Sequence, residues 1–293
     1  MKRILRSIAV LVAAAALMLP WMSQANAQNT WSYVSTSGND ANNCATAATA
    51  CGTWEGALSK TDDNGAILCA NAGHFGFLFI TKSVTIDCLA GGNGQIFQIN
   101  APGKTVTLRH LSADNAHVGG GLVPIDIVAA SQVYIEDVMI ARSSSGAPGI
   151  RDRRAGPAVL TIKNTSIVYN TGPGIVVVPA SGAIGVDLEN VTSAYNTFGL
   201  AIASGGRVTI KNSFFTNNSV AGIESDGGTF LNINGSQVAF NEMGVLSHGS
   251  TTLSQTQIIS NTTAINGATQ STGNNLIVGN STDGTAPTII SSR

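Results

Sequence analysis

The densest group of residues that could do chemistry is the run Arg151-Asp152-Arg153-Arg154, which lies between strand-like segments beginning at Val133 and Leu160. Guanidinium groups hold carboxylates through paired hydrogen bonds, so three arginines this close together are a candidate binding site for an acidic glycan. Long connecting segments are also where proteins often carry binding residues. The simpler interpretation, which we favour, is a loop held together by ion pairs among its own side chains.

Other ionisable residues are weaker candidates. Asp187 occupies the same repeat position as Tyr134, two units further on, and could face the arginine run, although a plain surface aspartate is the simpler interpretation. His110 and His248 are single histidines without metal-ligand neighbours, so a turn or surface role is favoured for both. We therefore assign no catalytic residue and no metal site from the sequence.

Short repeated segments must position these residues. Each segment alternates apolar and polar residues, which is the period of a strand with one buried face. Successive segments from Val84 to Thr251 begin 22, 27, 27, 26, 22, 23 and 20 residues apart. The segments are Val84–Cys88, Val106–His110, Val133–Asp137, Leu160–Asn164, Val186–Asn190, Val208–Asn212, Leu231–Gly235 and Thr251–Gln255.

An asparagine recurs with the same spacing as these segments. An asparagine follows six residues after each of the last five segments, and soon afterwards a second short apolar pair begins, as in Gly174-Ile175. Stacked coils explain a fixed asparagine, because its side chain can hydrogen-bond to its counterparts about 4.8 Å above and below. Each unit is therefore predicted to contain a strand, an asparagine turn and a second strand. The predicted structural ladder is Asn170, Asn196, Asn218, Asn241 and Asn261.

These units predict an all-β fold, a single right-handed parallel β-helix (solenoid) with a short N-terminal capping helix over Trp54–Lys60. Leucine-rich repeats need regular leucines, and propeller blades need about 40 residues or more. The helix would cover the open edge of the first coil, which otherwise invites aggregation. One buried stack is predicted to contain Ile135, Ile162, Leu188, Ile210, Ile233 and Leu253.

The first residues have the form of a secretory signal. Lys2 and Arg3 precede an apolar run from Ile8 to Leu19, and Ala25-Asn26-Ala27 supplies a cleavage site. The apolar run is shorter than the roughly 20 residues that span a bilayer, so no transmembrane segment is expected after cleavage. The predicted organisation is a signal peptide at 1–27, a cap region at 28–63 and a β-helix with a polar tail at 64–293. The protein is expected to be secreted or periplasmic.

Composition excludes one class of partner. Removal of residues 1–27 takes away three basic side chains and leaves 12 basic and 16 acidic ones, a formal charge of −4. Phosphate binding requires a basic surface, so nucleic acid is not an expected partner. Only 11% of the chain is charged, but apolar positions recur regularly to its end, which favours a folded β protein over disorder.

Four cysteines, Cys44, Cys51, Cys69 and Cys88, all lie in the first third of the chain that follows the signal peptide. An even number in an exported protein indicates disulfides, and the spacings are not those of a zinc site. Three pairings are possible. We favour Cys44–Cys51, which closes a small loop, and Cys69–Cys88, because the repeat alignment stacks these two positions.

The stretch Tyr33-Val-Ser-Thr-Ser-Gly-Asn-Asp40, the predicted capping helix and Ser83-Val-Thr-Ile-Asp87 together resemble the opening of bacterial secreted β-helix proteins of the pectin-lyase-like class. The resemblance implies a polysaccharide partner and, for an enzyme, a polysaccharide lyase or glycoside hydrolase. Lyase chemistry of this class further implies calcium held by acidic residues, although no cofactor is evident in the sequence. The resemblance is specific for fold and weak for activity, because the class contains lyases, hydrolases, epimerases and binding modules. The polygalacturonase combination of Asn-Thr-Asp, Asp-Asp and Gly-His-Gly is absent.

Two functional hypotheses follow. The first is an exported β-helix protein that binds, and in an enzyme would cleave, an acidic polysaccharide gripped by Arg151, Arg153 and Arg154, with Asp152 and Asp187 nearby. The second is a non-catalytic envelope or extracellular scaffold, resembling an adhesin, which the lack of a convergent acid cluster supports. Neither the repeat nor the composition indicates an oligomeric state.

Overall fold

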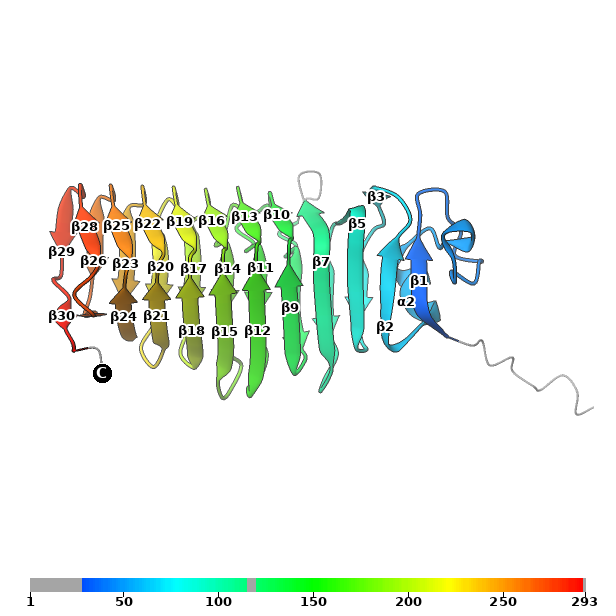
Figure 1. Cartoon of the computed structure of the whole chain (residues 1–293), viewed down its shortest axis with the longest axis horizontal. Coiled ribbons are helices and arrows are strands. Elements are labelled where there is room, and N and C mark those ends of the chain that lie inside the picture. Colours follow the sequence, from blue (N-terminus) through cyan, green and yellow to red (C-terminus); the bar gives the residue numbers. More distant parts are fainter. Residues whose placement is uncertain (1–27, 115–119, 292–293) are drawn as a thin grey trace, which may run out of the picture.

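The computed structural model describes residues 28–114 and 120–291, which form a parallel β-solenoid (Figure 1). The predicted signal peptide at 1–27 lies outside the described residues. Successive coils stack side by side along the long axis, and every strand pairs in parallel with its counterparts in the neighbouring coils. The prediction of a parallel β-helix is confirmed.

The strands form three columns along the solenoid, here called the first, second and third columns. The first contains β1 (Asn29–Val34), β2 (Thr61–Cys69), β5 (Val84–Gly94), β7 (Thr105–Asp114), β9 (Gln132–Glu136), β12 (Ala158–Lys163), β15 (Ile184–Glu189), β18 (Gly206–Lys211), β21 (Phe230–Asn234), β24 (Ser250–Ser254), β27 (Gln270–Ser271) and β30 (Thr288–Ile289). The second contains β3 (Gly73–His74), β10 (Met139–Ala141), β13 (Ser166–Val168), β16 (Thr192–Ala194), β19 (Phe214–Thr216), β22 (Gln237–Ala239), β25 (Gln257–Ile259) and β28 (Leu276–Val278).

The third column is a separate ten-stranded sheet. The long strands β5 and β7 run through both the first and the second column, and they join these two columns into one sheet. The third column contains β4 (Leu78–Ile80), β6 (Phe97–Asn100), β8 (Ile125–Ala129), β11 (Ile150–Asp152), β14 (Ile175–Val177), β17 (Phe198–Ile202), β20 (Ala221–Ser225), β23 (Met243–Ser247), β26 (Thr263–Asn266) and β29 (Thr282–Gly284).

A regular coil therefore has three strands, and the prediction of two strands per unit was wrong. The overlooked strands are those of the second column, such as β13, which has only three residues. So short a strand shows too little alternation to be recognised from its sequence.

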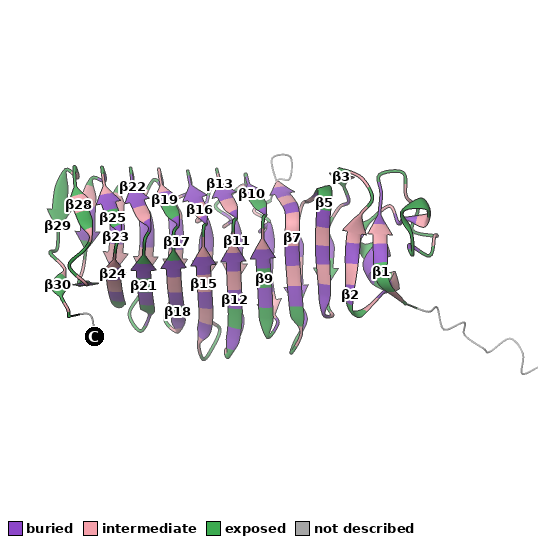
Figure 2. Cartoon of the chain, in the orientation of Figure 1, coloured by how far each residue is buried: buried purple, intermediate pink, exposed green. Residues whose placement is uncertain are grey.

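The core is a set of stacked aliphatic side chains inside the solenoid. Alternation along the strands turns every second residue inward, and Figure 2 shows the resulting buried bands across the coils. The predicted stack is confirmed: its members pair in register from β9 to β24, and each is at most 1% exposed. Burying one such side chain contributes about 1.5–3 kcal/mol, so the stack is a main source of stability.

The five predicted ladder asparagines lie in one buried stack after the second column. Asn196 Oδ1 accepts from the backbone N–H of Asn170 at 3.1 Å and from its side chain at 2.9 Å. Asn241 does the same for Asn218, at 2.9 and 3.0 Å. Each side chain thus replaces a strand hydrogen bond where the chain turns, and Asn280 extends the stack by one coil.

The N-terminal end is covered by α2 (Trp54–Lys60), at the place expected from the sequence. Trp54 is fully buried, and its ring packs edge-on against Phe75, with ring centroids 5.1 Å apart. Thr53 caps the helix by accepting from the Gly56 N–H at 3.0 Å. No helix in the described part of the chain is long and apolar enough to cross a membrane.

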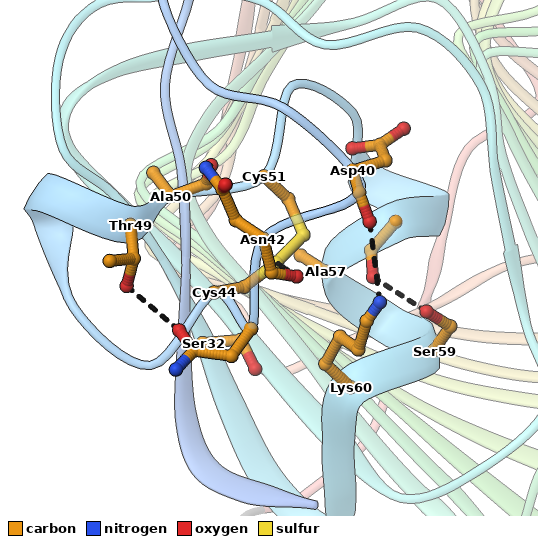
Figure 3. The surroundings of a disulfide bond; sticks show 12 residues. Ser32, Asp40, Asn42, Cys44, Thr49, Ala50, Cys51, Ala57, Ser59 and Lys60 are labelled. Atoms are coloured by element: carbon orange, nitrogen blue, oxygen red, sulfur yellow. Dashed lines mark hydrogen bonds between the residues drawn. A yellow bond between two sulfur atoms is a disulfide. The ribbon is translucent and has the colours of Figure 1, made fainter. Parts of the chain in front are cut away.

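Two disulfides fasten this end, and both have the favoured pairing. Cys44–Cys51 closes a loop beside α2 (Figure 3). This loop contains the short 3₁₀ helix η2 (Ala47–Thr49). Cys69–Cys88 joins the first column across β2 and β5. Both lie near the N-terminal end of the solenoid, and the described residues contain no free cysteine.

Replacing Asn218 with Ala is expected to destabilise the fold strongly. The change leaves the Asn196 N–H and the Ser193 carbonyl without the partners they have at 3.1 and 3.2 Å. Each buried group left unpaired costs about 1–3 kcal/mol. Urea unfolding followed by circular dichroism measures the loss. Asn234→Ala, on an exposed position of β21, is the control and should change the unfolding free energy by less than about 0.5 kcal/mol.

Candidate functional site

The arginine run begins on a strand of the third column and does not lie in a long insertion, so the predicted loop was wrong. Ile150–Asp152 forms β11, which pairs with β8 before it and β14 after it. The sequence held a signal for this, because Gly149-Ile150 matches Gly174-Ile175 in the next coil. The match was hidden because Ser143 stands where the next coil has the ladder residue Asn170.

Alternation along β11 and the two residues that follow it separates the four candidate residues into two groups. Asp152 and Arg154 point inward and form a buried ion pair, with Arg154 only 1% exposed. Arg154 Nε and Nη2 donate to the two Asp152 oxygens at 2.8 and 2.6 Å, and Nη1 donates to the Ala130 carbonyl at 3.1 Å. These two residues therefore support the coil and cannot reach a ligand.

Arg151 and Arg153 point outward and hold the same carboxylate. Arg151 Nε and Nη2 donate to the two oxygens of Asp126 at 2.9 and 3.1 Å. Arg153 makes the matching pair of bonds at 3.1 and 2.9 Å. Asp126 is buried on β8, directly beneath Arg151 in the sheet. Both guanidinium groups are part-exposed, and no hydrogen bond uses their Nη1 atoms among the described residues.

The two arginines keep Asp126 ionised. Burial of the carboxyl raises its pKa, but hydrogen bonds from Arg153 and Arg151 lower it by more, so the pKa is below its usual range. The pKa of Arg153 is raised in turn by its hydrogen bonds to Asp126. The cluster has two positive charges and one negative charge, so it presents a net positive charge to the surface.

Apolar side chains complete a groove of about 410 Å³ around this cluster. Phe77, Phe79, Leu122 and Val123 are the larger apolar residues among those that line it, together with Ile96. Phe79 is half exposed, because it is the outward residue between Leu78 and Ile80 on β4. Sequence analysis missed both phenylalanines, although the alternation of β4 already predicts an outward Phe79.

The outward residues of the third column show how the fold builds this groove. Register pairs Phe79 with Gln98, Gln98 with Asp126, and Asp126 with Arg151, one residue per coil. Four neighbouring coils thus present an aromatic ring, an amide, a carboxylate and a guanidinium in line. Further along, the same row continues with Val176 and other residues.

Asp187 does not join the arginine cluster, so the less favoured of its two interpretations from the sequence was wrong. It lies on β15 in the first column, in register with Thr161 and Thr209, whereas the arginines belong to the third column. Its carboxylate is 3.9 Å from Lys211 Nζ. A separate cavity of about 440 Å³ is lined by Asp187, Tyr134, Lys163 and other residues of the first column.

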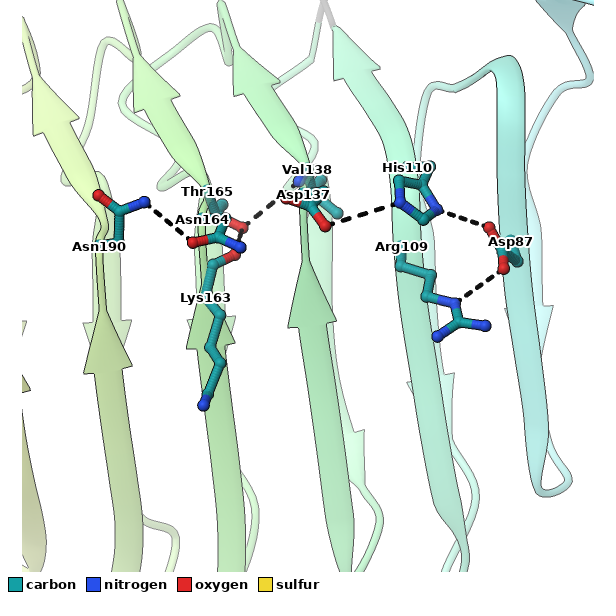
Figure 4. A network of polar contacts seen from close by, with 9 residues as sticks. All are labelled: Asp87, Arg109, His110, Asp137, Val138, Lys163, Asn164, Thr165 and Asn190. Atoms are coloured by element: carbon teal, nitrogen blue, oxygen red, sulfur yellow. Dashed lines mark hydrogen bonds and ion pairs between the residues drawn. The ribbon is translucent and has the colours of Figure 1, made fainter.

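A polar network at the corner between the first and second columns was not anticipated (Figure 4). His110 Nδ1 lies 2.7 Å from Asp87 Oδ1, and its Nε2 lies 3.6 Å from Asp137 Oδ2. Arg109 Nε donates to the other Asp87 oxygen at 2.8 Å. The next coils continue the corner with Asn164 and Asn190, which share a 2.9 Å hydrogen bond, so the network is part of a corner ladder.

The described residues contain no group of three or more His, Cys, Asp or Glu side chains that could hold a metal ion. Asp126, the acid in the arginine groove, does not fit calcium. Both of its oxygens already accept from guanidinium groups, which would also repel a cation.

No family model matches the chain, and no curated protein sequence matches it. Solved structures do. A crystal structure of pectate lyase Pel9A matches 90% of this chain and 78% of its own at 14% identity, with a TM-score of 0.52. A rhamnogalacturonan lyase matches 81% of this chain and 75% of its own at 11% identity, also with a TM-score of 0.52. The chain shares the fold of these two structures, a parallel β-helix. At these identities the likeness shows the fold alone.

The buried Asp152–Arg154 pair should be far more important for stability than the outward arginine beside it. Arg154→Met leaves the Asp152 carboxylate buried without its partner and is expected to lower the unfolding free energy by about 3–5 kcal/mol. Arg153→Met, on the exposed side, should cost less than about 1 kcal/mol, because Arg151 still holds Asp126. Urea unfolding of both variants at neutral pH compares the two losses.

Asp126 should make the stability depend on acid. Its pKa is lowered in the folded protein, so its contribution is present above the pKa of the unfolded chain, about 3.9, and is lost as pH falls through the lower folded value. Asp126→Asn should therefore destabilise the protein at pH 7 and show a smaller stability loss than the wild type between pH 5 and pH 2. Asp283→Asn, on the exposed strand β29, is the control.

Proposed function

We propose that this protein binds an acidic polysaccharide in the groove formed by Phe77, Phe79, Leu122, Arg151 and Arg153. The observation that carries the proposal is the pair of outward guanidinium groups beside exposed aromatic rings. Asp126 fixes both guanidinium groups through two bonds each, which leaves the Nη1 edges oriented before any ligand binds. A fixed donor loses less entropy on binding than a free arginine.

The composition of the groove favours a sugar chain that carries carboxylates. Arginine recognises carboxylates with directed hydrogen bonds, and the net positive charge attracts an anionic polymer. Aromatic rings offer flat apolar surfaces on which the C–H faces of sugar rings can pack. Apolar walls with a few fixed polar groups are typical of a binding site for a small ligand or a ligand segment.

The proposed activity is binding rather than cleavage. Hydrolysis of a glycosidic bond requires two carboxyl groups, one on each side of the bond. Asp126 is the one carboxylate among the described residues that line the groove, and its oxygens are held by the arginines. A base or acid for the reaction is therefore not provided by this side chain.

The proposal also includes the compartment in which the protein would meet its ligand. Both solved neighbours are described as lyases of polysaccharides, pectate and rhamnogalacturonan, which supports a polysaccharide ligand. Two disulfides support an oxidising compartment, such as the periplasm or the exterior of a cell. An exported protein with the predicted signal peptide would meet such polymers there.

Affinity electrophoresis with polygalacturonate and alginate tests the proposal. The wild type should be retarded, and the retardation should fall with added salt because charges are involved. Arg151→Gln/Arg153→Gln should bind roughly 10- to 100-fold more weakly, since a hydrogen bond to a charged group contributes about 1.5–3 kcal/mol. Phe79→Ala should weaken binding as well, without changing its salt dependence.

Lys211→Gln, on the first column, is the matched control for a lost positive charge and should bind as the wild type does. Equal retardation of the wild type and the double variant would remove the arginine groove as the site. The same preparations are assayed for unsaturated sugar products, with and without calcium. Release of such products by the wild type would replace binding with lyase activity as the function.

A further inference from the structure

A second row of outward residues follows the corner after the second column. It has one residue per coil, each immediately before a ladder residue or its equivalent: Arg142, Tyr169, Tyr195, Asn217, Phe240 and Ser260. The backbone N–H of each of the first five donates to the next coil, as Tyr195 does to the Thr216 carbonyl at 3.3 Å. We call these six residues the corner row.

Every member of the corner row has a left-handed backbone, with φ between 55° and 58°. This conformation is easy for Gly and Asn and unfavourable for bulky side chains. The corner after the first column also has a left-handed backbone. It is occupied mostly by residues that adopt this conformation easily, such as Asn164, Asn190, Asn212 and Gly235. Tyr169, Tyr195 and Phe240 are thus not residues that the backbone selects.

Packing does not account for these rings either. Tyr169, Tyr195 and Phe240 are 57%, 50% and 59% exposed. Tyr169 and Tyr195 stack on each other with centroids 4.8 Å apart and an angle of 12° between their planes, so each ring covers one face of the other. A side chain that is conformationally costly and contributes little to the core points to a function at the surface.

A groove of about 770 Å³ lies over this corner. Tyr195 and Phe240 lie in it two coils apart, which is about 9–10 Å from the spacing of parallel strands. Asn217 lies between them, and Ser219, Glu242 and Thr262 add polar groups. Thr262 Oγ1 donates to Glu242 Oε2 at 3.2 Å, so the groove edge is already hydrogen-bonded.

We propose that the corner groove binds an uncharged polysaccharide, with pyranose rings stacked on Tyr195 and Phe240. Sugar rings present C–H faces to aromatic rings and hydroxyl groups at their edges, which matches aromatic rings flanked by amide, hydroxyl and carboxylate groups. The site is independent of the arginine groove, which lies on the third column.

The ligands proposed for the two grooves differ in charge. Glu242 is the one acidic or basic side chain among the described residues that line the corner groove. With no arginine or lysine in its lining, the groove offers nothing to neutralise uronate carboxylates, and Glu242 repels them. An uncharged chain avoids that repulsion and can still donate hydroxyl hydrogen bonds to the carboxylate.

The test uses Tyr195→Asn, Phe240→Asn and the double variant, because Asn already stands at Asn217 in the same row. Affinity electrophoresis with hydroxyethylcellulose, xylan and galactomannan provides the probes. The wild type should bind at least one of them, and the double variant should bind it roughly tenfold more weakly or not at all. Phe230→Ala, an exposed aromatic of the first column, should bind as the wild type does.

Three further readouts make the proposal falsifiable. The melting temperatures of the Asn variants should equal or exceed that of the wild type, because Asn suits the left-handed backbone; a clear fall would assign the rings a structural role. Arg151→Gln/Arg153→Gln should retain binding to the uncharged probe, even where it has lost the acidic one. Absence of wild-type binding to all three probes, or a dimer in sedimentation that only the aromatic rings maintain, would overturn the proposal.

Discussion

Parallel hydrogen bonding between successive coils is the constraint on which the rest of this molecule depends. It places each residue directly over its counterpart one coil away, so like positions gather in rows whatever their chemistry. Rows of Ile and Leu become the core, and the asparagine row replaces strand bonds where the chain turns. The outward rows are not needed by the core, and they are free to carry a groove or a charge pattern. Residues that bind are therefore arranged along the axis, one per coil.

The fold was largely predictable because the same residue types recur at the same positions of each coil. Alternating apolar residues and asparagines at a fixed offset specify coil stacking, and the Cys69–Cys88 pairing followed from the same alignment. The second-column strands were not predictable, since three residues such as Ser166–Val168 carry no readable period. The third column was predicted from its apolar pairs in the last five coils, but Arg151 was assigned to a loop because Ser143 stands where the ladder asparagine is expected in its coil.

The candidate sites were less predictable, because what an outward residue does depends on neighbours in other coils. Arg151 and Arg153 were found from sequence, but their partner Asp126 lies 25 and 27 residues away and became visible only in the sheet register. Arg154 shows the opposite error: this charge is buried although it directly follows the exposed Arg153, because inward and outward positions alternate even where the sequence is uniformly polar.

The two disulfides have a mechanical consequence, since both lie at one end of the solenoid. Each coil contacts only its neighbours, so the loss of a terminal coil exposes the next one and leaves distant coils intact. The N-terminal coils are covalently tied and covered by α2, whereas β29 and β30 at the far end are exposed throughout. Under tension or protease attack, the structure is therefore expected to peel from the C-terminal end, one coil at a time. Both grooves would then disappear in a fixed order, the corner groove before the arginine groove.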